Sequence, residues 1–315
     1  ARMAAISEMP EPWRRSLGKW RTLNRRWKRK IEESEAPDAN EEYLLYQTLL
    51  GAWPLEPFRE LSAEARGEFV GRIQQYMAKA LKEAKLNTSW VQPNEPWDAA
   101  VAEFVARVLD PSPKNRFLES FLPLAEEAAR IGAMNSLSQT LLKLSSPGVP
   151  DIYQGSETWD FSLVDPDNRR PVDYAWRREM LDSLGKATPE ELLGNWRDGR
   201  IKMFLTQRLL TFRREQPALF ARGNYTPLDL TGEFAECCVA FVRAHEEKSI
   251  VLLAPRLSAR VGFPPIGEAW RDTAVQLPSS LGEGRDLFTN DTQPAGEALP
   301  LARAFARLPF ALLVY

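Results

Sequence analysis

The chain has 315 residues, of which 44% are hydrophobic and 27% are charged, and its formal net charge is −2. This balance is typical of a soluble globular protein with a large core. It argues against a partner bound mainly through phosphates, so no nucleic acid is expected. No apolar run of about 18 residues occurs, so we expect no membrane span, and the first residues lack the apolar core of a signal peptide.

Cysteine and histidine are scarce. The only cysteines are the neighbours Cys237 and Cys238, and the only histidine is His245. A disulfide between neighbours is strained, so we expect two reduced thiols in a cytoplasmic protein. The set is too small for a structural zinc site, and no metal or cofactor is indicated. A Ser-His-Asp or Cys-His hydrolase would have to use His245, which falls in a predicted strand, so we expect this residue near a surface hairpin instead.

Residues 1–145 are predicted to be helical. Trp13, Trp20 and Trp27 recur every seven residues and therefore follow one stripe of a helix. Packing of this stripe against another helix is favoured over a sugar-binding platform. Nine basic residues and no acid lie from Arg14 to Lys30, which indicates a solvated helix face rather than an RNA-binding arm.

Further helices are predicted at residues 41–50, from the N-cap Ser62 onward, at 98–109 and at 115–144. A loop marked by two prolines precedes the third of these and carries Trp90 and Asn94. Polar and aromatic residues on such a loop either form a binding surface or cap and anchor the neighbouring helices. The sequence leaves both interpretations open.

Residues 146–174, SPGVPDIYQGSETWDFSLVDPDNRRPVDY, combine a short apolar run with acidic, amide and aromatic residues. Within them, residues 148–153 are predicted to form a buried strand. Aromatic faces stack on sugar rings, while carboxylates, amides and Arg pair with hydroxyl groups. A carbohydrate site at the carboxyl end of a parallel strand is therefore predicted.

Two more helices are predicted at residues 177–184 and 201–215. From about residue 225, short apolar or alternating runs separated by Gly, Pro, Asn and Asp predict an antiparallel β-sandwich. One parallel-type strand cannot satisfy its own backbone groups, so the partner strands of residues 148–153 are expected in a preceding part of a longer protein.

The segment GVPDIYQGSE resembles the last barrel strand of the α-amylase superfamily of (β/α)8-barrel enzymes. The continuation WDFSLVDPDNRRPVDY is more specific and is similar to the maltooligosyl trehalose synthases. Further similarity in EEYLLYQTLLGAWP, KEAKLNTSWVQPNE and LPLARAFARLPFALLVY extends the resemblance over nearly the whole chain.

The resemblance implies an α+β chain that contains the last strand and helix of a (β/α)8 barrel. Residues 1–145 would be a helical region inserted into the barrel. Residues 146–223 would supply the last barrel strand, a substrate loop and closing helices, and residues 224–315 a C-terminal antiparallel β-sandwich.

The resemblance also implies a chemistry. These enzymes retain anomeric configuration and use an Asp nucleophile, a Glu acid/base and a second Asp, on barrel strands 4, 5 and 7. A synthase would turn the reducing-end α-1,4 link of a malto-oligosaccharide into an α,α-1,1 link by intramolecular transglycosylation. Those strands would lie upstream of Ala1. We therefore expect no catalytic carboxylate in this chain and no activity of the chain alone.

One wall of the substrate site would remain, formed by Tyr153, Gln154, Glu157, Trp159, Asp160, Asp165, Asp167, Asn168 and Arg169, with Lys85, Ser89 and Trp90 as candidates for the opposite wall. An alternative for Asp165, Asn168 and Arg170 is a self-capped loop, in which they bond backbone groups and one another.

Two other functions stay open: a non-catalytic carbohydrate-binding or interaction module, and another α-amylase relative such as a 4-α-glucanotransferase. The apolar flanks of residues 148–153 would need cover. We expect this cover from the helical segment or from an associated partner chain, or else expect no regular strand at these residues.

Overall fold

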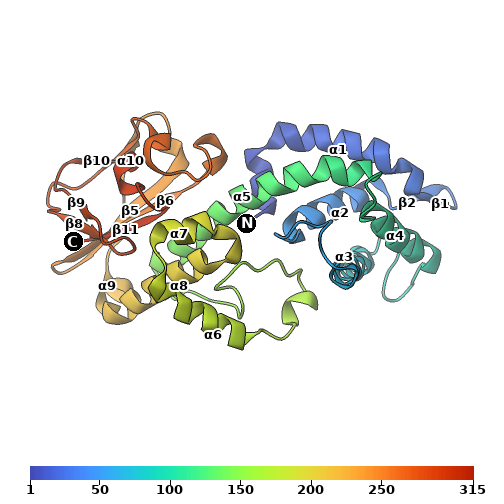
Figure 1. Cartoon of the computed structure of the whole chain (residues 1–315), viewed down its shortest axis with the longest axis horizontal. Coiled ribbons are helices and arrows are strands. Elements are labelled where there is room, and N and C mark those ends of the chain that lie inside the picture. The colour runs from blue at the N-terminus through green and yellow to red at the C-terminus, as the bar shows by residue number, and fades with distance from the viewer. The chain divides into compact units, whose positions relative to one another are not determined.

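The computed structural model describes residues 1–315, and their contacts divide the chain into two compact units. The helical unit comprises Arg2–Ala129 and Phe161–Pro171, and the sheet unit comprises Arg130–Asp160 and Val172–Tyr315 together with Ala1. Helix α5 (Arg116–Ser145) therefore contributes residues to both (Figure 1). The mixture of helix and sheet agrees with the predicted class, and the division into three domains remains a proposal.

Four complete helices and the start of α5 build the helical unit: α1 (Pro10–Asn24), α2 (Ala39–Ala52), α3 (Ala63–Ala84) and α4 (Glu95–Val108). Short 3₁₀ helices lie at η1 (Met3–Glu8), η2 (Arg25–Trp27) and η3 (Asp167–Arg169), and a two-stranded antiparallel ladder joins β1 (Arg29–Ile31) to β2 (Ser34–Ala36).

Side-chain caps fix where three of these helices begin. Asp38 forms a capping box with Glu41 at α2, Ser62 caps α3 as predicted, and Asn94 caps α4. Each cap satisfies backbone N–H groups that have no partner inside the helix.

Aromatic rings fill the core of the helical unit. Trp20 on α1 is fully buried, and its ring centroid lies 5.2 Å from that of Tyr46 on α2 and 5.4 Å from that of Phe117 on α5. Trp13 is also buried, and Trp27 is partly buried. The tryptophan stripe thus packs against neighbouring helices, as predicted, while the basic residues of α1 point to solvent.

The sheet unit begins with the end of α5 and continues through α6 (Tyr174–Ser183), η4 (Leu184–Lys186), α7 (Pro189–Gly194), η5 (Trp196–Asp198), α8 (Arg200–Glu215) and α9 (Pro217–Arg222). None of the helices in either unit is both long and apolar enough to cross a bilayer.

Two antiparallel sheets follow (Figure 1). The larger has the order β3-β5-β6-β11-β8-β9 and the smaller the order β10-β7-β4. Their strands are β3 (Thr226–Pro227), β4 (Leu230–Thr231), β5 (Cys238–His245), β6 (Lys248–Pro255), β7 (Ala274–Gln276), β8 (Gly284–Asp286), β9 (Thr292–Gln293), β10 (Ala298–Pro300) and β11 (Ala311–Val314). Short helices between them are η6 (Ala235–Cys237), η7 (Ser258–Arg260), η8 (Gly267–Trp270) and α10 (Leu301–Ala304).

The two sheets share one hydrophobic core. Val251 and Leu313 of the larger sheet belong to the same buried cluster as Val275 and Leu299 of the smaller one. Residues on the opposite face of the larger sheet, such as Leu252, are buried as well. Burial on both faces explains why its central strands read as nearly continuous apolar runs rather than as an alternating pattern.

Candidate functional site

Residues 148–153 form no strand in this structure, so the prediction of a buried strand is wrong here. Val149 is 97% exposed, Ile152 is 37% exposed and Tyr153 is 49% exposed. All strands of the sheet unit lie after residue 225 and pair among themselves. Residues 148–153 therefore have no ladder to join. The alternative expectation, that no regular strand forms without its partners, holds, and Tyr153 and Gln154 lie at the surface.

Residues 155–160, called the clamped segment below, are held from α6, η5 and α8. Arg177 on α6 forms an ion pair with Glu157 and donates a hydrogen bond to the Gly155 carbonyl (3.2 Å). The Trp159 indole N–H donates to the Trp196 carbonyl at 2.6 Å. Glu157 is thus paired with a cation of its own unit, and Trp159 shows only part of its ring to solvent.

The contact from α8 is made by a buried lysine. Lys202 is only 8% exposed, and its Nζ donates to the Thr158 carbonyl at 3.0 Å. It lines a cavity of about 50 Å³ together with Lys143, Glu157, Thr140, Ser156 and Thr206, among others. Burial and the like charge of Lys143 lower the pKa of Lys202 to about 8, although Asp160 and Glu157 act in the opposite direction.

Residues 161–171, called the acidic loop below, belong to the helical unit and are fastened to α3. Both carboxylate oxygens of Asp167 accept hydrogen bonds from Arg72, at 2.9 and 2.8 Å. Lys79 donates to the Asp165 carbonyl at 2.9 Å, and Arg170 pairs with Glu68 at 3.2 Å. Burial alone would raise the pKa of Asp167, but the hydrogen bonds and charge of Arg72 outweigh it and hold that pKa below its usual value.

Hydrogen bonds inside the acidic loop complete its order. Arg169 forms a two-pronged ion pair with Asp165, at 2.7 and 2.8 Å. The Asn168 side chain accepts from the Asp165 backbone N–H at 3.0 Å, and the Asp167 carboxylate accepts from the Leu163 N–H at 2.8 Å. These contacts are those of the self-capped loop, with the difference that the main external partner is Arg72, about which the sequence alone gave no signal.

Residues 86–94, called the Trp90 loop below, join α3 to α4. Ser89 and Gln92 bond each other, with the Gln92 N–H donating to Ser89 Oγ at 2.9 Å. The Asn94 N–H donates to Thr88 Oγ1 at 3.1 Å. The polar side chains of the loop thus hold its backbone, whereas Trp90 is 61% exposed, with Lys82 Nζ 5.1 Å from its ring centroid. Lys85, in the left-handed conformation that ends α3, is exposed too.

The predicted site residues fall into two groups. Tyr153, Gln154, Glu157, Trp159 and Asp160 belong to the sheet unit, and Lys85, Ser89, Trp90, Asp165, Asp167, Asn168 and Arg169 belong to the helical unit. Within the helical unit, the acidic loop is attached to α3, the helix that leads into the Trp90 loop.

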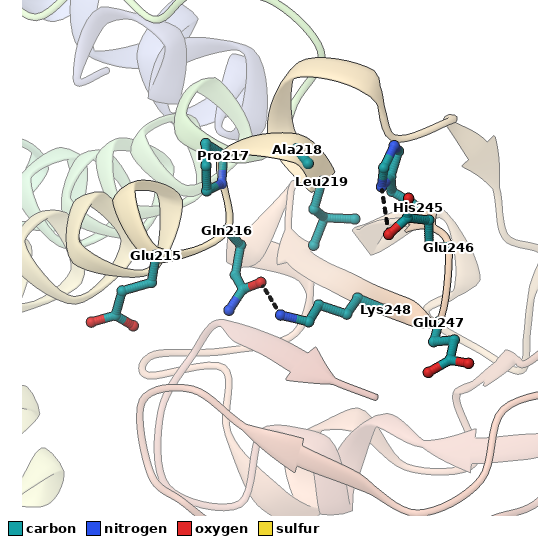
Figure 2. A pocket seen from close by; sticks show the side chains of 9 residues that line it. All are labelled: Glu215, Gln216, Pro217, Ala218, Leu219, His245, Glu246, Glu247 and Lys248. Atoms are coloured by element: carbon teal, nitrogen blue, oxygen red, sulfur yellow. Dashed lines mark hydrogen bonds and ion pairs between the residues drawn. The ribbon is translucent and has the colours of Figure 1, made fainter.

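A shallow hollow of about 500 Å³ lies where α8 meets α9, beside the β5–β6 turn (Figure 2). His245 lines it next to this turn, as the sequence predicts, with Nδ1 4.0 Å from a carboxylate oxygen of Glu246. Gln216 and Lys248 bond each other across the same hollow. Neither cysteine forms a disulfide, as predicted; both are buried, and burial raises the pKa of Cys238.

The chain is similar over its whole length to known proteins. No protein-family model matches it. It is 34% identical over 321 aligned residues, covering 100% of this chain, to a putative maltooligosyl trehalose synthase of Mycobacterium tuberculosis, of which it spans 35%. The solved maltooligosyltrehalose synthase from Arthrobacter ramosus is 33% identical and superposes with a TM-score of 0.77 over 99% of this chain and 36% of its own.

A second solved structure, a maltooligosyl trehalose synthase, gives 30% identity and a TM-score of 0.76 over 99% of this chain and 37% of its own. The predicted resemblance is therefore confirmed for sequence and for fold. The chain spans little more than a third of the relatives that it matches. Over its entire length, this chain is related to the maltooligosyl trehalose synthases, and it aligns with about a third of the length of each.

Proposed function

We propose that this chain is part of a maltooligosyl trehalose synthase, a (1→4)-α-D-glucan 1-α-D-glucosylmutase of the isomerase class. The whole protein would convert the reducing-end α-1,4 link of a malto-oligosaccharide into an α,α-1,1 link. The observation that carries the proposal is similarity along the entire chain, in sequence and in fold, to proteins of this name. A cytoplasmic location is part of the proposal.

In this proposal the chain contacts the sugar and orders the loops of the binding site, but it supplies no catalytic group. Two of its loop acids pair with cations: Asp167 with Arg72, and Glu157 with Arg177. A nucleophile or proton donor needs a carboxyl group free to meet the sugar. The Asp, Glu and Asp of a retaining mechanism would be supplied by other parts of the whole protein, so we expect the 315-residue chain alone to be inactive.

We further propose that residues 146–223 supply a substrate loop and closing helices to a (β/α)8 barrel, and that the two sheets of residues 224–315 form a β-sandwich. The ordered loops would leave Tyr153, Gln154 and Trp90 for contact with glucose rings, because these side chains are exposed. The acids and amides of the acidic loop would keep it rigid. This rigidity lowers the entropy cost of binding.

The test of the activity uses the whole protein with maltopentaose. The expected product is a non-reducing isomer of unchanged mass. Shorter and longer maltodextrins would instead identify a 4-α-glucanotransferase, and tight binding without turnover would favour a carbohydrate-binding module. Formation of the non-reducing isomer by the 315-residue chain alone would contradict the proposed absence of catalytic carboxylates.

The sugar contact of Trp90 has a test of its own. Trp90→Ala in the whole protein should weaken maltoheptaose binding about fivefold, since stacking on an exposed indole contributes on the order of 1 kcal/mol. Trp176→Ala is the matched control, because Trp176 on α6 is 44% exposed and also lies beside a cation, Arg177. Equal affinities of both variants and the unaltered protein would remove Trp90 from the proposed site.

A further inference from the structure

The start of α8 carries a cation where a helix favours an anion. Lys202 is the third residue of α8, which begins at Arg200 after the cap Gly199. The first turn of a helix has a partial positive charge, so an ammonium buried there is destabilised. Lys202 is nevertheless nine-tenths buried, and its Nζ donates a hydrogen bond to the Thr158 carbonyl.

The clamped segment packs directly on this helix start. A Cβ built on Gly199, whose φ is +81°, would lie 3.2 Å from Thr158 Cβ and 3.4 Å from the Trp159 backbone nitrogen. Thr158 itself is only 3% exposed. The positive φ favours glycine at 199, and an added Cβ would make tight contacts with Thr158 and Trp159. The Lys202 ammonium adds a polar link between α8 and the segment.

We propose that Lys202 is a positioning residue: its protonated ammonium helps to hold the clamped segment on the start of α8, and transfer of that proton to solvent loosens this contact. This inference goes beyond the proposed function and does not require that any sugar be bound. A movement of the segment would also move Tyr153, one of the proposed sugar contacts, because the Ser156 N–H donates a hydrogen bond to the Tyr153 carbonyl at 3.1 Å.

The charges around Lys202 set the pH at which its ammonium loses a proton. Lys143 faces it from α5 and disfavours the ammonium, whereas Glu157 and Asp160 of the clamped segment favour it. Arg177 on α6 pairs with Glu157 and thereby offsets part of the stabilisation that Glu157 gives the Lys202 ammonium. With burial as the largest effect, the pKa falls from its usual 10.5 to about 8. A charged donor makes a hydrogen bond roughly twice as strong as a neutral one, so the link weakens as pH rises through this value.

The test follows the indole N–H of Trp159 by NMR in the chain with ¹⁵N-labelled tryptophan, assigned through Trp159→Phe. This N–H donates to the Trp196 carbonyl and lies next to the Lys202 contact. Between pH 6.5 and 9.5 its signal should change with a midpoint near 8. In Lys202→Arg the transition should vanish, because a guanidinium stays charged over this range.

Two further variants sharpen the result. Lys143→Met removes the like charge and should move the midpoint to higher pH. Lys202→Met should show the high-pH signal at every pH, and if that variant fails to fold, Lys202→Arg decides. A Trp159 signal that is constant with pH in the unaltered chain, or that changes identically in Lys202→Arg, would overturn the proposal. A merely structural Lys202 would give no such pH profile.

Discussion

Replacement of Arg243 by methionine is expected to destabilise the sheet unit strongly. Arg243 on β5 is 1% exposed, and its guanidinium donates to the carbonyls of Ser145 (3.2 Å), Phe220 (3.0 Å), Gly223 (3.0 Å) and Asn224 (3.3 Å). No carboxylate is among these partners. Instead, the cation meets carbonyls at the carboxyl ends of α5 and α9, where helices carry a partial negative charge.

The size of the expected loss of stability follows from the carbonyl groups that lose their hydrogen-bond donor. Methionine fills a similar volume, so the main loss is in hydrogen bonding, with four carbonyls losing a charged donor. Each buried carbonyl left unpaired costs about 1–3 kcal/mol, but the losses are not additive, because water can reach some of these groups. We therefore expect a loss of about 3–5 kcal/mol. A lysine in place of Arg243 has a single ammonium and a shorter reach, so it would recover only part of this loss. Arg243→Lys should therefore cost about half as much as Arg243→Met.

Thermal unfolding monitored by circular dichroism measures the effect. A loss of about 3–5 kcal/mol corresponds to a decrease in Tm of roughly 10 °C for a unit of this size. Arg260→Met is the matched control, since Arg260 pairs with Glu236 at the surface and should change stability by less than about 1 kcal/mol. If Arg243→Met melted within about 2 °C of the unaltered chain, the reasoning about buried helix-end carbonyls would be refuted.

Three other changes have definite expected outcomes. Asp167→Asn should destabilise the helical unit by about 1–3 kcal/mol. Because its folded pKa is lowered, the stabilisation should be present above the usual pKa of 3.8 and be lost as pH falls below it; urea midpoints at pH 3 and 6 should differ less in the variant. Gly223→Ala would place Cβ 2.2 Å from the Leu219 carbonyl oxygen and should cost more than about 2 kcal/mol, whereas Gly185→Ala, with open space around it, should lie within about 1 kcal/mol of the unaltered chain in the same assay. Cys238 should resist a thiol reagent at pH 8 in the folded chain and react once urea is added, because burial raises its pKa; rapid labelling of the folded chain would contradict this.

Local chemistry made most of the helices predictable. The N-cap at Ser62, the periodic apolar residues of α8 and the tryptophan stripe of α1 all specify their structure within a few turns of chain. The predicted strand at residues 148–153 failed for the opposite reason. A strand needs hydrogen bonds from neighbours, and this chain brings none beside it.

The sequence named the candidate site residues, and the structure shows what each of them contacts within its own unit. The motifs that contain these residues gave the resemblance that the comparisons confirm, whereas their contact with sugar remains a proposal. It did not separate the residues that shape a loop from those that the loop displays. From the sequence, Asp167 and Trp90 were equally good candidates for sugar contact. In the structure Asp167 forms a two-pronged ion pair with Arg72, whereas Trp90 is exposed.

The sequence by itself thus determined the family resemblance, the helices and the strand-rich C-terminal region, because these depend on neighbours close along the chain. Only the tertiary structure decided which polar groups are engaged. Arg72 meets Asp167 across 95 positions, and Lys202 meets the Thr158 carbonyl across 44. Whether a charged side chain contacts a ligand, holds a loop or changes its protonation depends on its burial and its partners in the folded chain. A local sequence pattern encodes neither the burial nor the partners.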